Sequence, residues 1–163
     1  MRSTVAVIAC LIYVAAATRY EWVCENNVRS FGRRVYDQHH AEASLHAANG
    51  VAEFGNSLSS YPHEFKNKPG FRFPRAECNN LKEGQYLLEY PLFRDTIYKQ
   101  NPTTKRPVKN RAQSEEKKPL PGPARVIYLA RTKTFCGVIT HVGQENEPSK
   151  GGFALCARRT RRG

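Results

Sequence analysis

Negative charge is scarce in this sequence. Its 163 residues include 14 Asp and Glu against 26 Lys and Arg, and the formal net charge is +12. So basic a chain favours a polyanionic partner, and RNA, DNA, an acidic lipid and an acidic glycan all fit that description. Charge alone does not choose among them, and the same excess serves solubility or general adhesion to surfaces.

Two further absences narrow the chemistry. None of the five cysteines forms a CxxC pair, the spacing typical of structural zinc sites, and we therefore reject a zinc site. No N-x-S/T sequon is present either, because Pro102 occupies the middle position of the candidate at Asn101. The sequence therefore predicts neither a zinc protein nor N-glycosylation.

Long apolar runs are missing as well, apart from one at the amino terminus. Residues 1–18, MRSTVAVIACLIYVAAAT, combine one basic residue, an apolar stretch and small residues up to Ala17. This pattern is typical of a secretory signal peptide cut close to Ala17, and the run is short for a membrane span. An uncleaved anchor is the alternative interpretation. The sequence thus predicts a secreted, extracellular and soluble protein.

Removal of this leader leaves an even number of cysteines. Cys10 leaves with it, and the remaining cysteines are Cys24, Cys78, Cys136 and Cys156. Four cysteines in an exported chain predict two disulfides, with three possible connectivities. Each long crosslink would stabilise the fold by about 3–5 kcal/mol through loop entropy. About 145 residues remain after the leader, enough for one domain and hardly for two, and we assign that domain to residues 19–156.

The remaining pattern indicates one helix among short strands. Residues 36–50, YDQHHAEASLHAANG, predict a helix with Asp37 near its start and Gly50 as a stop signal. Residues 20–36 before it predict a hairpin that turns near Gly32. The later runs rich in aromatic and branched residues predict strands: SYPHEF, GFRF, QYLLEYPLF, ARVIYLA, FCGVITHV and GFALC. The fold class is therefore α+β, with one helix packed on a twisted antiparallel sheet.

Histidines cluster on the expected helix. His39, His40 and His46 all lie within it. Clustered histidines can bind a metal ion, but these lack acidic or cysteine partners at a suitable spacing. We therefore predict no metal site.

Much of the positive charge lies in two segments. Residues 98–121 have no hydrophobic period, and residues 99–118 carry seven Lys or Arg against two Glu. This composition predicts a basic loop, which is either a docking element or a tolerated insertion. Residues 157–163 add four arginines beyond the last cysteine, and we expect them to form a flexible tail.

Polar residues interrupt or flank several of the apolar strands. Each alone is explained by a strand end that faces water. Together they supply a carboxylate, a guanidinium, two imidazoles and a phenol: Glu89, Arg125, His63, His141 and Tyr61. If the strands are neighbours in one sheet, these groups provide a base, an acid and a cation for phosphoryl chemistry without a metal.

Five segments carry a resemblance to a known family. In chain order they are YPH, LLEYP, PGPARVIY, CGVITH and GFALC, and YDQHHAEA precedes them. They resemble the fungal secreted ribonucleases and, more closely, the sarcin-like ribotoxins. The resemblance extends over residues 22–156. It implies a helix on an antiparallel sheet with an N-terminal hairpin and long loops, and the disulfide pairs Cys24–Cys156 and Cys78–Cys136.

The resemblance also implies a role for each polar residue. Glu89 would be the general base that removes the proton of a ribose 2′-OH, and His141 the general acid that protonates the leaving 5′-oxygen. His63, Arg125 and Tyr61 would stabilise the phosphate. The product would be a 2′,3′-cyclic phosphate, with no metal and no cofactor. The residues that would contact substrate further from the reacting atoms are Phe153, Asn67, Lys117 and Lys118.

Two departures from the family pattern concern specificity. Residues 66–70 keep Asn67 but lack the tyrosine and the acidic residue with which the relatives read guanine. The loop between His63 and Glu89 is short, whereas the basic loop before residue 121 is long. This long loop is the candidate replacement for docking on the ribosome.

Three functions remain. The first is a secreted ribotoxin that cleaves one bond in the sarcin–ricin loop of large ribosomal RNA and stops translation. The second is a general extracellular ribonuclease with relaxed base preference, and the third is a non-catalytic effector that binds RNA or a host protein. The complete polar set favours the two enzymes. We expect a monomer that acts on RNA in intact ribosomes and meets an acidic membrane surface during uptake.

Overall fold

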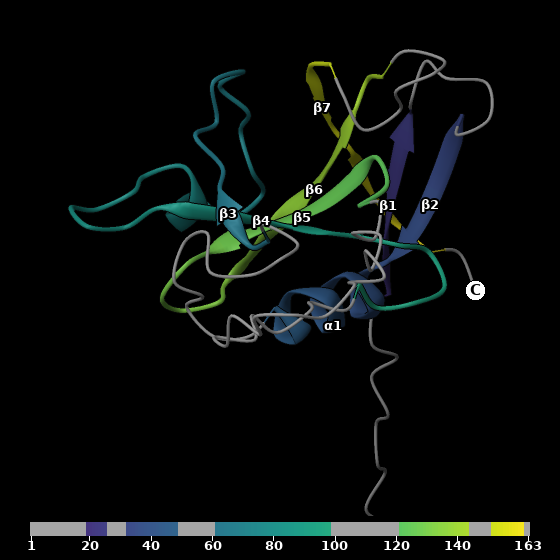
Figure 1. Ribbon diagram of the computed structural model, residues 1–163, viewed down its shortest axis with the longest axis horizontal. Coiled ribbons are helices and arrows are strands. Elements are labelled where there is room, and N and C mark those ends of the chain that lie inside the picture. Colours follow the sequence, from purple (N-terminus) through teal and green to yellow (C-terminus); the bar gives the residue numbers. More distant parts are fainter. Residues whose placement is uncertain (1–18, 26–31, 49–60, 99–120, 144–150, 162–163) are drawn as a thin grey trace, which may run out of the picture.

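The computed structural model describes residues 19–25, 32–48, 61–98, 121–143 and 151–161. The leader, the basic loop and Lys117 and Lys118 within it lie outside these ranges. Along the chain the elements are β1 (Tyr20–Glu25), β2 (Arg33–Asp37), α1 (Gln38–Ala47), β3 (His63–Glu64), the short 3₁₀ helix η1 (Ala76–Cys78), β4 (Leu87–Pro91), β5 (Ala124–Leu129), β6 (Phe135–His141), β7 (Phe153–Leu155) and β8 (Ala157–Thr160), as Figure 1 shows. The α+β class is confirmed. Within the described ranges no helix is long and apolar enough to cross a membrane.

The strands form two antiparallel sheets. The larger has the order β3-β4-β5-β6-β7, and the smaller the order β2-β1-β8. The smaller sheet contains the predicted N-terminal hairpin, β1 and β2, and the chain after Cys156 adds a third strand that pairs with β1. The prediction of a flexible tail is therefore wrong for Ala157–Thr160, which form β8.

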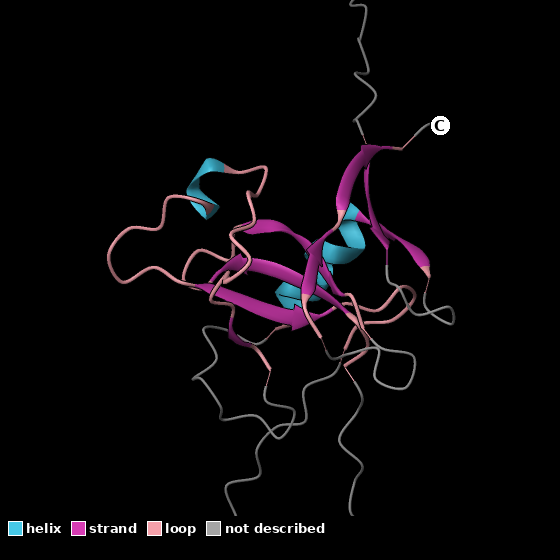
Figure 2. Ribbon diagram, turned by 90° about the horizontal axis from the view of Figure 1, so that it is seen from above, coloured by secondary structure: helices cyan, strands magenta, loops and turns pink. Residues whose placement is uncertain are grey.

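Helix α1 begins and ends close to where the sequence indicates. The Asp37 side chain accepts hydrogen bonds from the backbone N–H groups of His39 (2.9 Å) and His40 (3.4 Å), as an N-cap does. Ala41 and Leu45 are buried and pack the helix against β4, β5 and β6 on one face of the larger sheet (Figures 1 and 2).

Strand alternation gives the larger sheet two different faces. Leu88, Tyr90, Val126, Tyr128 and Val138 belong to the core on the helix side. Their neighbours in sequence face the other way and form a second core: Leu87, Ile127, Leu129 and Ile139, with Phe65 and Phe73 from the preceding loop. A two-residue period therefore places Glu89, Arg125 and His141 on the face opposite α1.

Two expected strands are shortened or absent. Around Pro62, whose bond to Tyr61 is cis, only His63–Glu64 remain as β3, since proline has no N–H to give to a ladder. The GFRF segment is a loop, and Asn79 holds it by bonding the Phe73 N–H (2.7 Å) and carbonyl (2.8 Å).

Both disulfides have the pairing that the family resemblance implies. Cys24 is joined to Cys156 across 132 residues, and Cys78 to Cys136 across 58. The first ties β1 to the start of β8, and the second ties η1 to β6. On the loop-entropy account each contributes about 4–5 kcal/mol.

Candidate active site

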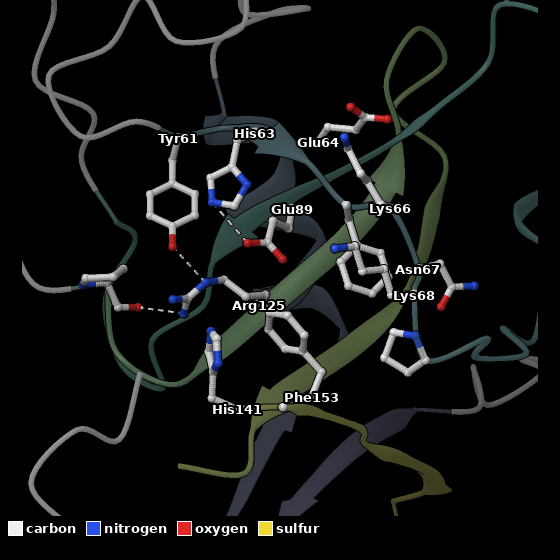
Figure 3. A pocket seen from close by; sticks show the side chains of 14 residues that line it. Tyr61, His63, Glu64, Lys66, Asn67, Lys68, Glu89, Arg125, His141 and Phe153 are labelled. Carbon is white, nitrogen blue, oxygen red and sulfur yellow. Dashed lines mark hydrogen bonds and ion pairs between the residues drawn. The ribbon is translucent and has the colours of Figure 1, made fainter. Parts of the chain in front are cut away.

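Strand register brings together four of the five polar side chains that the sequence singled out, and Tyr61 directly precedes β3. His63 lies opposite Glu89, Arg125 opposite Ile139, and His141 opposite Phe153. Opposite residues share a face of the sheet. His63, Glu89, Arg125 and His141 therefore lie on the face away from α1, and together with Tyr61 and Phe153 they line one cavity of about 590 Å³ (Figure 3).

Glu89 is a carboxylate inside the sheet, with 3% of its surface exposed. Its Oε1 lies 3.1 Å from Nε2 of His63, and among the described residues its Oε2 has no hydrogen-bond partner. Burial raises the pKa of Glu89 to about 7, although the charge of Arg125 acts in the opposite direction. Such a carboxyl group exchanges a proton near neutral pH, as a general base must.

Arg125 is a buried cation in a fixed orientation. Its Nη1 donates to the carbonyl oxygens of Pro121 (3.1 Å), Gly122 (2.6 Å) and Ala124 (2.8 Å), and its Nε donates to the Tyr61 hydroxyl (3.1 Å). A cation that already has a fixed orientation needs no reorganisation when negative charge develops beside it. Figure 3 shows its guanidinium between Glu89 and His141.

Tyr61 and His63 form a stacked pair beside this cation. Their ring centroids are 4.6 Å apart at an interplanar angle of 27°. The guanidinium carbon of Arg125 lies 5.2 Å from the centre of the Tyr61 ring. Burial raises the pKa of Tyr61, so the phenol stays protonated. The pair adds a hydroxyl and an imidazole to the anion site.

His141 ends β6 on the other side of the guanidinium. Its Nδ1 lies 3.3 Å from the Gly151 carbonyl oxygen. A carbonyl only accepts, so this bond places a proton on Nδ1 and leaves Nε2 as the reacting nitrogen. Phe153 covers the imidazole, with ring centroids 4.2 Å apart. Burial, and next the charge of Arg125, lower the pKa of His141 to about 4.

The remaining residues assigned to substrate have different positions. Phe153 is half-buried, packs against Phe65 and forms a wall of the cavity. Asn67 also lines the cavity, but its side chain closes a turn: Oδ1 accepts from the Phe71 N–H (2.8 Å) and Nδ2 donates to the Phe71 carbonyl (3.0 Å).

Sequence reasoning missed the backbone groups that hold the site. The carbonyls of Pro121 and Gly122 fix Arg125, and that of Gly151 orients His141. Backbone carbonyls leave no mark in residue type, although glycine in PGPAR is a partial signal. Gly122 has φ +62°, and a Cβ there would lie 3.3 Å from a Phe93 ring carbon. Lys66 and Lys68, which also line the cavity, were missed too.

The arrangement fits acid–base catalysis on a bound phosphate. A carboxylate and an imidazole flank an anion site made by Arg125, Tyr61 and His63. Within the described ranges, no three His, Cys, Asp or Glu side chains are grouped as metal ligands.

Known proteins share both the sequence and the fold. The ribonuclease family model matches residues 24–157. The chain is similar to ribonuclease alpha-sarcin of Aspergillus giganteus, with 32% identity over 83% of this chain and 82% of the relative. It is 30% identical to ribonuclease mitogillin of Aspergillus restrictus over 85% of each chain. The crystal structure of the Aspergillus ribotoxin restrictocin superposes with a TM-score of 0.61, covering 84% of this chain and 99% of restrictocin at 30% identity.

Proposed function

The chain belongs to the ribonuclease family, in its sarcin-like ribotoxin branch, and on that premise we propose that it cleaves one bond in the sarcin–ricin loop of large ribosomal RNA and so inhibits translation. The observation that carries the proposal is the placement of Glu89 and His141 on either side of the fixed Arg125 guanidinium. The proposed setting is extracellular, after secretion.

The reaction is a transphosphorylation. Glu89 takes the proton of the ribose 2′-OH, and the 2′-oxygen forms a bond to the adjacent phosphorus. The bond from phosphorus to the 5′-oxygen breaks, and His141 gives that oxygen its proton through Nε2. The products are a 2′,3′-cyclic phosphate and a free 5′-OH. DNA lacks the 2′-OH, so it binds without being cut.

Negative charge on the phosphate oxygens is stabilised by groups that are already in place. Arg125 supplies a full positive charge from a buried position, where electrostatic interactions are stronger than in water. Tyr61 and His63 supply further hydrogen-bond donors. Each is oriented before substrate binds, by the Arg125–Tyr61 bond and by the ring stack.

The two shifted pKa values imply that substrate moves a proton. With pKa values of about 7 for Glu89 and about 4 for His141, the single proton that the pair holds at intermediate pH resides mainly on Glu89. Reaction needs this proton on His141. A phosphate beside the imidazole stabilises the imidazolium and favours that transfer.

A solved relative supports the choice of RNA. Restrictocin has been crystallised with a 29-mer analogue of sarcin/ricin domain RNA, and it matches this chain with 29% identity and a TM-score of 0.62. Lys66 and Lys68 are exposed on the wall of the cavity, where they can meet phosphates next to the scissile one. Uptake across an acidic membrane and the monomeric state stay predictions.

One observation favours a second candidate, a ribonuclease of relaxed base preference. The Asn67 amide is engaged with Phe71, and the segment offers no tyrosine or acidic side chain for guanine. A base held without such contacts is read with little discrimination.

The test compares intact ribosomes with naked RNA. The mature wild type is incubated with each, beside Glu89→Gln and a matched control, Glu64→Gln, which neutralises an exposed carboxyl group near the cavity. One discrete fragment of the large ribosomal RNA, present with wild type and control and absent with Glu89→Gln, is the expected result. A smear on both substrates would favour the relaxed ribonuclease. Intact RNA in every lane would overturn catalysis altogether.

A further inference from the structure

Strand β8 lies at the carboxyl end of the matched family region. The family match ends at residue 157, the first residue of β8, and Arg158, Arg159 and Arg161 follow it. The strand pairs in register with β1, and the Arg161 N–H donates to the Arg19 carbonyl at 2.8 Å. The residues that follow the match therefore occupy a defined position on the smaller sheet.

Arg158 and Arg159 are exposed residues of an edge strand, and the exposed Arg161 follows that strand. The order β2-β1-β8 places β8 at the edge, and all four of its residues are exposed. Alternation puts Arg158 on one face and Arg159 on the other. Arg158 lies over Tyr20, 3.6 Å from the ring centre, and Arg161 Nη1 lies 3.5 Å from Asp37 Oδ2. We call Arg158, Arg159 and Arg161 the basic edge.

The basic edge is separate from the cleavage site. Its residues lie in β8 or directly after it, and none of them lines the cavity that holds Glu89 and His141. Any ligand of the edge therefore binds in addition to the scissile phosphate. A polymeric ligand can reach both places, whereas a dinucleotide cannot.

The chemistry of the edge fits phosphodiesters in a nucleic acid strand. Guanidinium groups present planar donor pairs to phosphate oxygens. Glu21 and Asp37 lie in one cross-strand row with Arg159 and repel a phosphate over that face. The favourable approach is therefore along the open edge.

A bilayer is a poorer match. Proteins that bind in the membrane interface place large apolar side chains beside their basic ones. Among the described residues the exposed large hydrophobics are Val35 and Leu81, and only Val35 belongs to this sheet. The edge carries charge without an apolar partner for lipid.

We propose that the basic edge is a second RNA-binding site, which holds phosphates of the RNA strand away from the scissile bond. This inference rests on the proposed ribonuclease function. The edge contributes affinity and orientation, and it leaves the chemical step unchanged, because phosphate contacts position a protein without reading sequence.

The test separates binding of long RNA from chemistry. The double variant Arg158→Gln/Arg159→Gln leaves Arg161 in contact with Asp37, the cap of α1. The matched control is Arg72→Gln/Arg131→Gln, which removes the same charge from exposed positions outside the small sheet. Binding to purified large-subunit ribosomal RNA is measured against salt concentration, with Glu89→Gln added to prevent cutting. Cleavage of a dinucleoside monophosphate is measured with Glu89 intact.

The double variant should lower the slope of log affinity against log salt by about 2, since each lost phosphate contact removes about 1. The control should change it by less than half as much. Arg158→Lys/Arg159→Lys should keep most of the slope, and thermal melting checks that all variants fold. Dinucleotide cleavage should be equal in all forms that keep Glu89.

Four results would overturn the inference. The first is an equal salt slope in the double variant and the control. The second and third are a double variant that binds RNA as wild type does but has lost affinity for phosphatidylserine vesicles, or has lost self-association. The fourth is a double variant whose cleavage of the dinucleotide falls as much as its binding of long RNA. Failure of the wild type to release the discrete fragment from intact ribosomes would instead count against the proposed function. The two failures are therefore distinguishable.

Discussion

Glu89 and His63 face each other across the β3–β4 ladder, with Oε1 and Nε2 3.1 Å apart. The carboxylate is almost fully buried, whereas 41% of the histidine side chain is exposed. His63 therefore forms the boundary between the buried base and the solvent. The pair orients Glu89 toward the cavity before any substrate arrives, and several consequences can be measured.

The first prediction concerns the pH dependence of cleavage. Below about pH 4 both Glu89 and His141 are protonated and no base is available, while above about pH 7 both have lost their protons and no acid is available. Between these limits the pair holds one proton, and the reactive fraction is constant. The kcat/KM for a dinucleoside monophosphate should therefore form a bell with limbs near 4 and 7. A kcat/KM that keeps rising from pH 7 to 9 would show that His141 is not the general acid.

The second prediction concerns stability. Because the folded pKa of Glu89 is about 7 and the ordinary value is 4.5, its contribution to the free energy of unfolding is full below pH 4.5 and is lost as pH rises through 7. Glu89→Gln should therefore be more stable than wild type at pH 8, by about 3 kcal/mol, and nearly equal to it at pH 4.

Urea unfolding at the two pH values measures this difference. Glu64→Gln serves as the control, since that side chain is exposed and its substitution should leave the free energy of unfolding nearly unchanged at both. The opposite effect of His141 is common to all variants and cancels in the comparison. If the stability difference between Glu89→Gln and wild type is the same at pH 8 as at pH 4, then burial does not destabilise the charged carboxylate of Glu89.

Much of the site could be predicted from sequence because its side chains contradict their surroundings. Glu89 and Arg125 lie in strands whose other positions are mostly apolar. Burying a charged side chain is unfavourable unless other groups compensate it, so charged residues at such positions indicate a site. Strand alternation then put both on one face. Asn67 was predicted from its family position, and the structure shows that its side chain serves a turn.

The third strand of the smaller sheet and the carbonyl groups around Arg125 could not be predicted in this way. Nothing in ARRTRRG alternates between apolar and polar residues, so a tail was expected. Its strand conformation comes from pairing with β1 next to the Cys24–Cys156 disulfide, which is a tertiary effect. Backbone carbonyls such as those of Pro121 and Gly151 are present at every position, and only the fold selects which ones act.

The third prediction tests the carbonyls that hold Arg125. Gly122→Ala places a side chain at φ +62° and 3.3 Å from Phe93, a strain of order 1–3 kcal/mol. Relief of this strain moves the Gly122 carbonyl away from Arg125, so kcat should fall about tenfold or more. The control is Gly84→Ala, which has φ +71° and open space around the new Cβ. It should lose stability but keep kcat. Equal kcat in both variants would show that these carbonyls do not position Arg125.

The last prediction concerns the ring that covers the general acid. Phe153 lies 4.2 Å from the His141 imidazole, and burial is the main cause of the low pKa of His141. Phe153→Ala exposes the imidazole, so its pKa should rise from about 4 toward 6.5 and the acid limb of the rate profile should move up with it. The limb near pH 7 should stay in place, because Glu89 keeps its position inside the sheet and its contact with His63. An NMR titration of the imidazole protons measures the pKa directly.

Phe71→Ala is the control, since Phe71 packs on Phe65 in the same core and its loss should leave the pKa of His141 unchanged. If both variants shift the pKa equally, general loosening of the core is responsible rather than the cover that Phe153 provides.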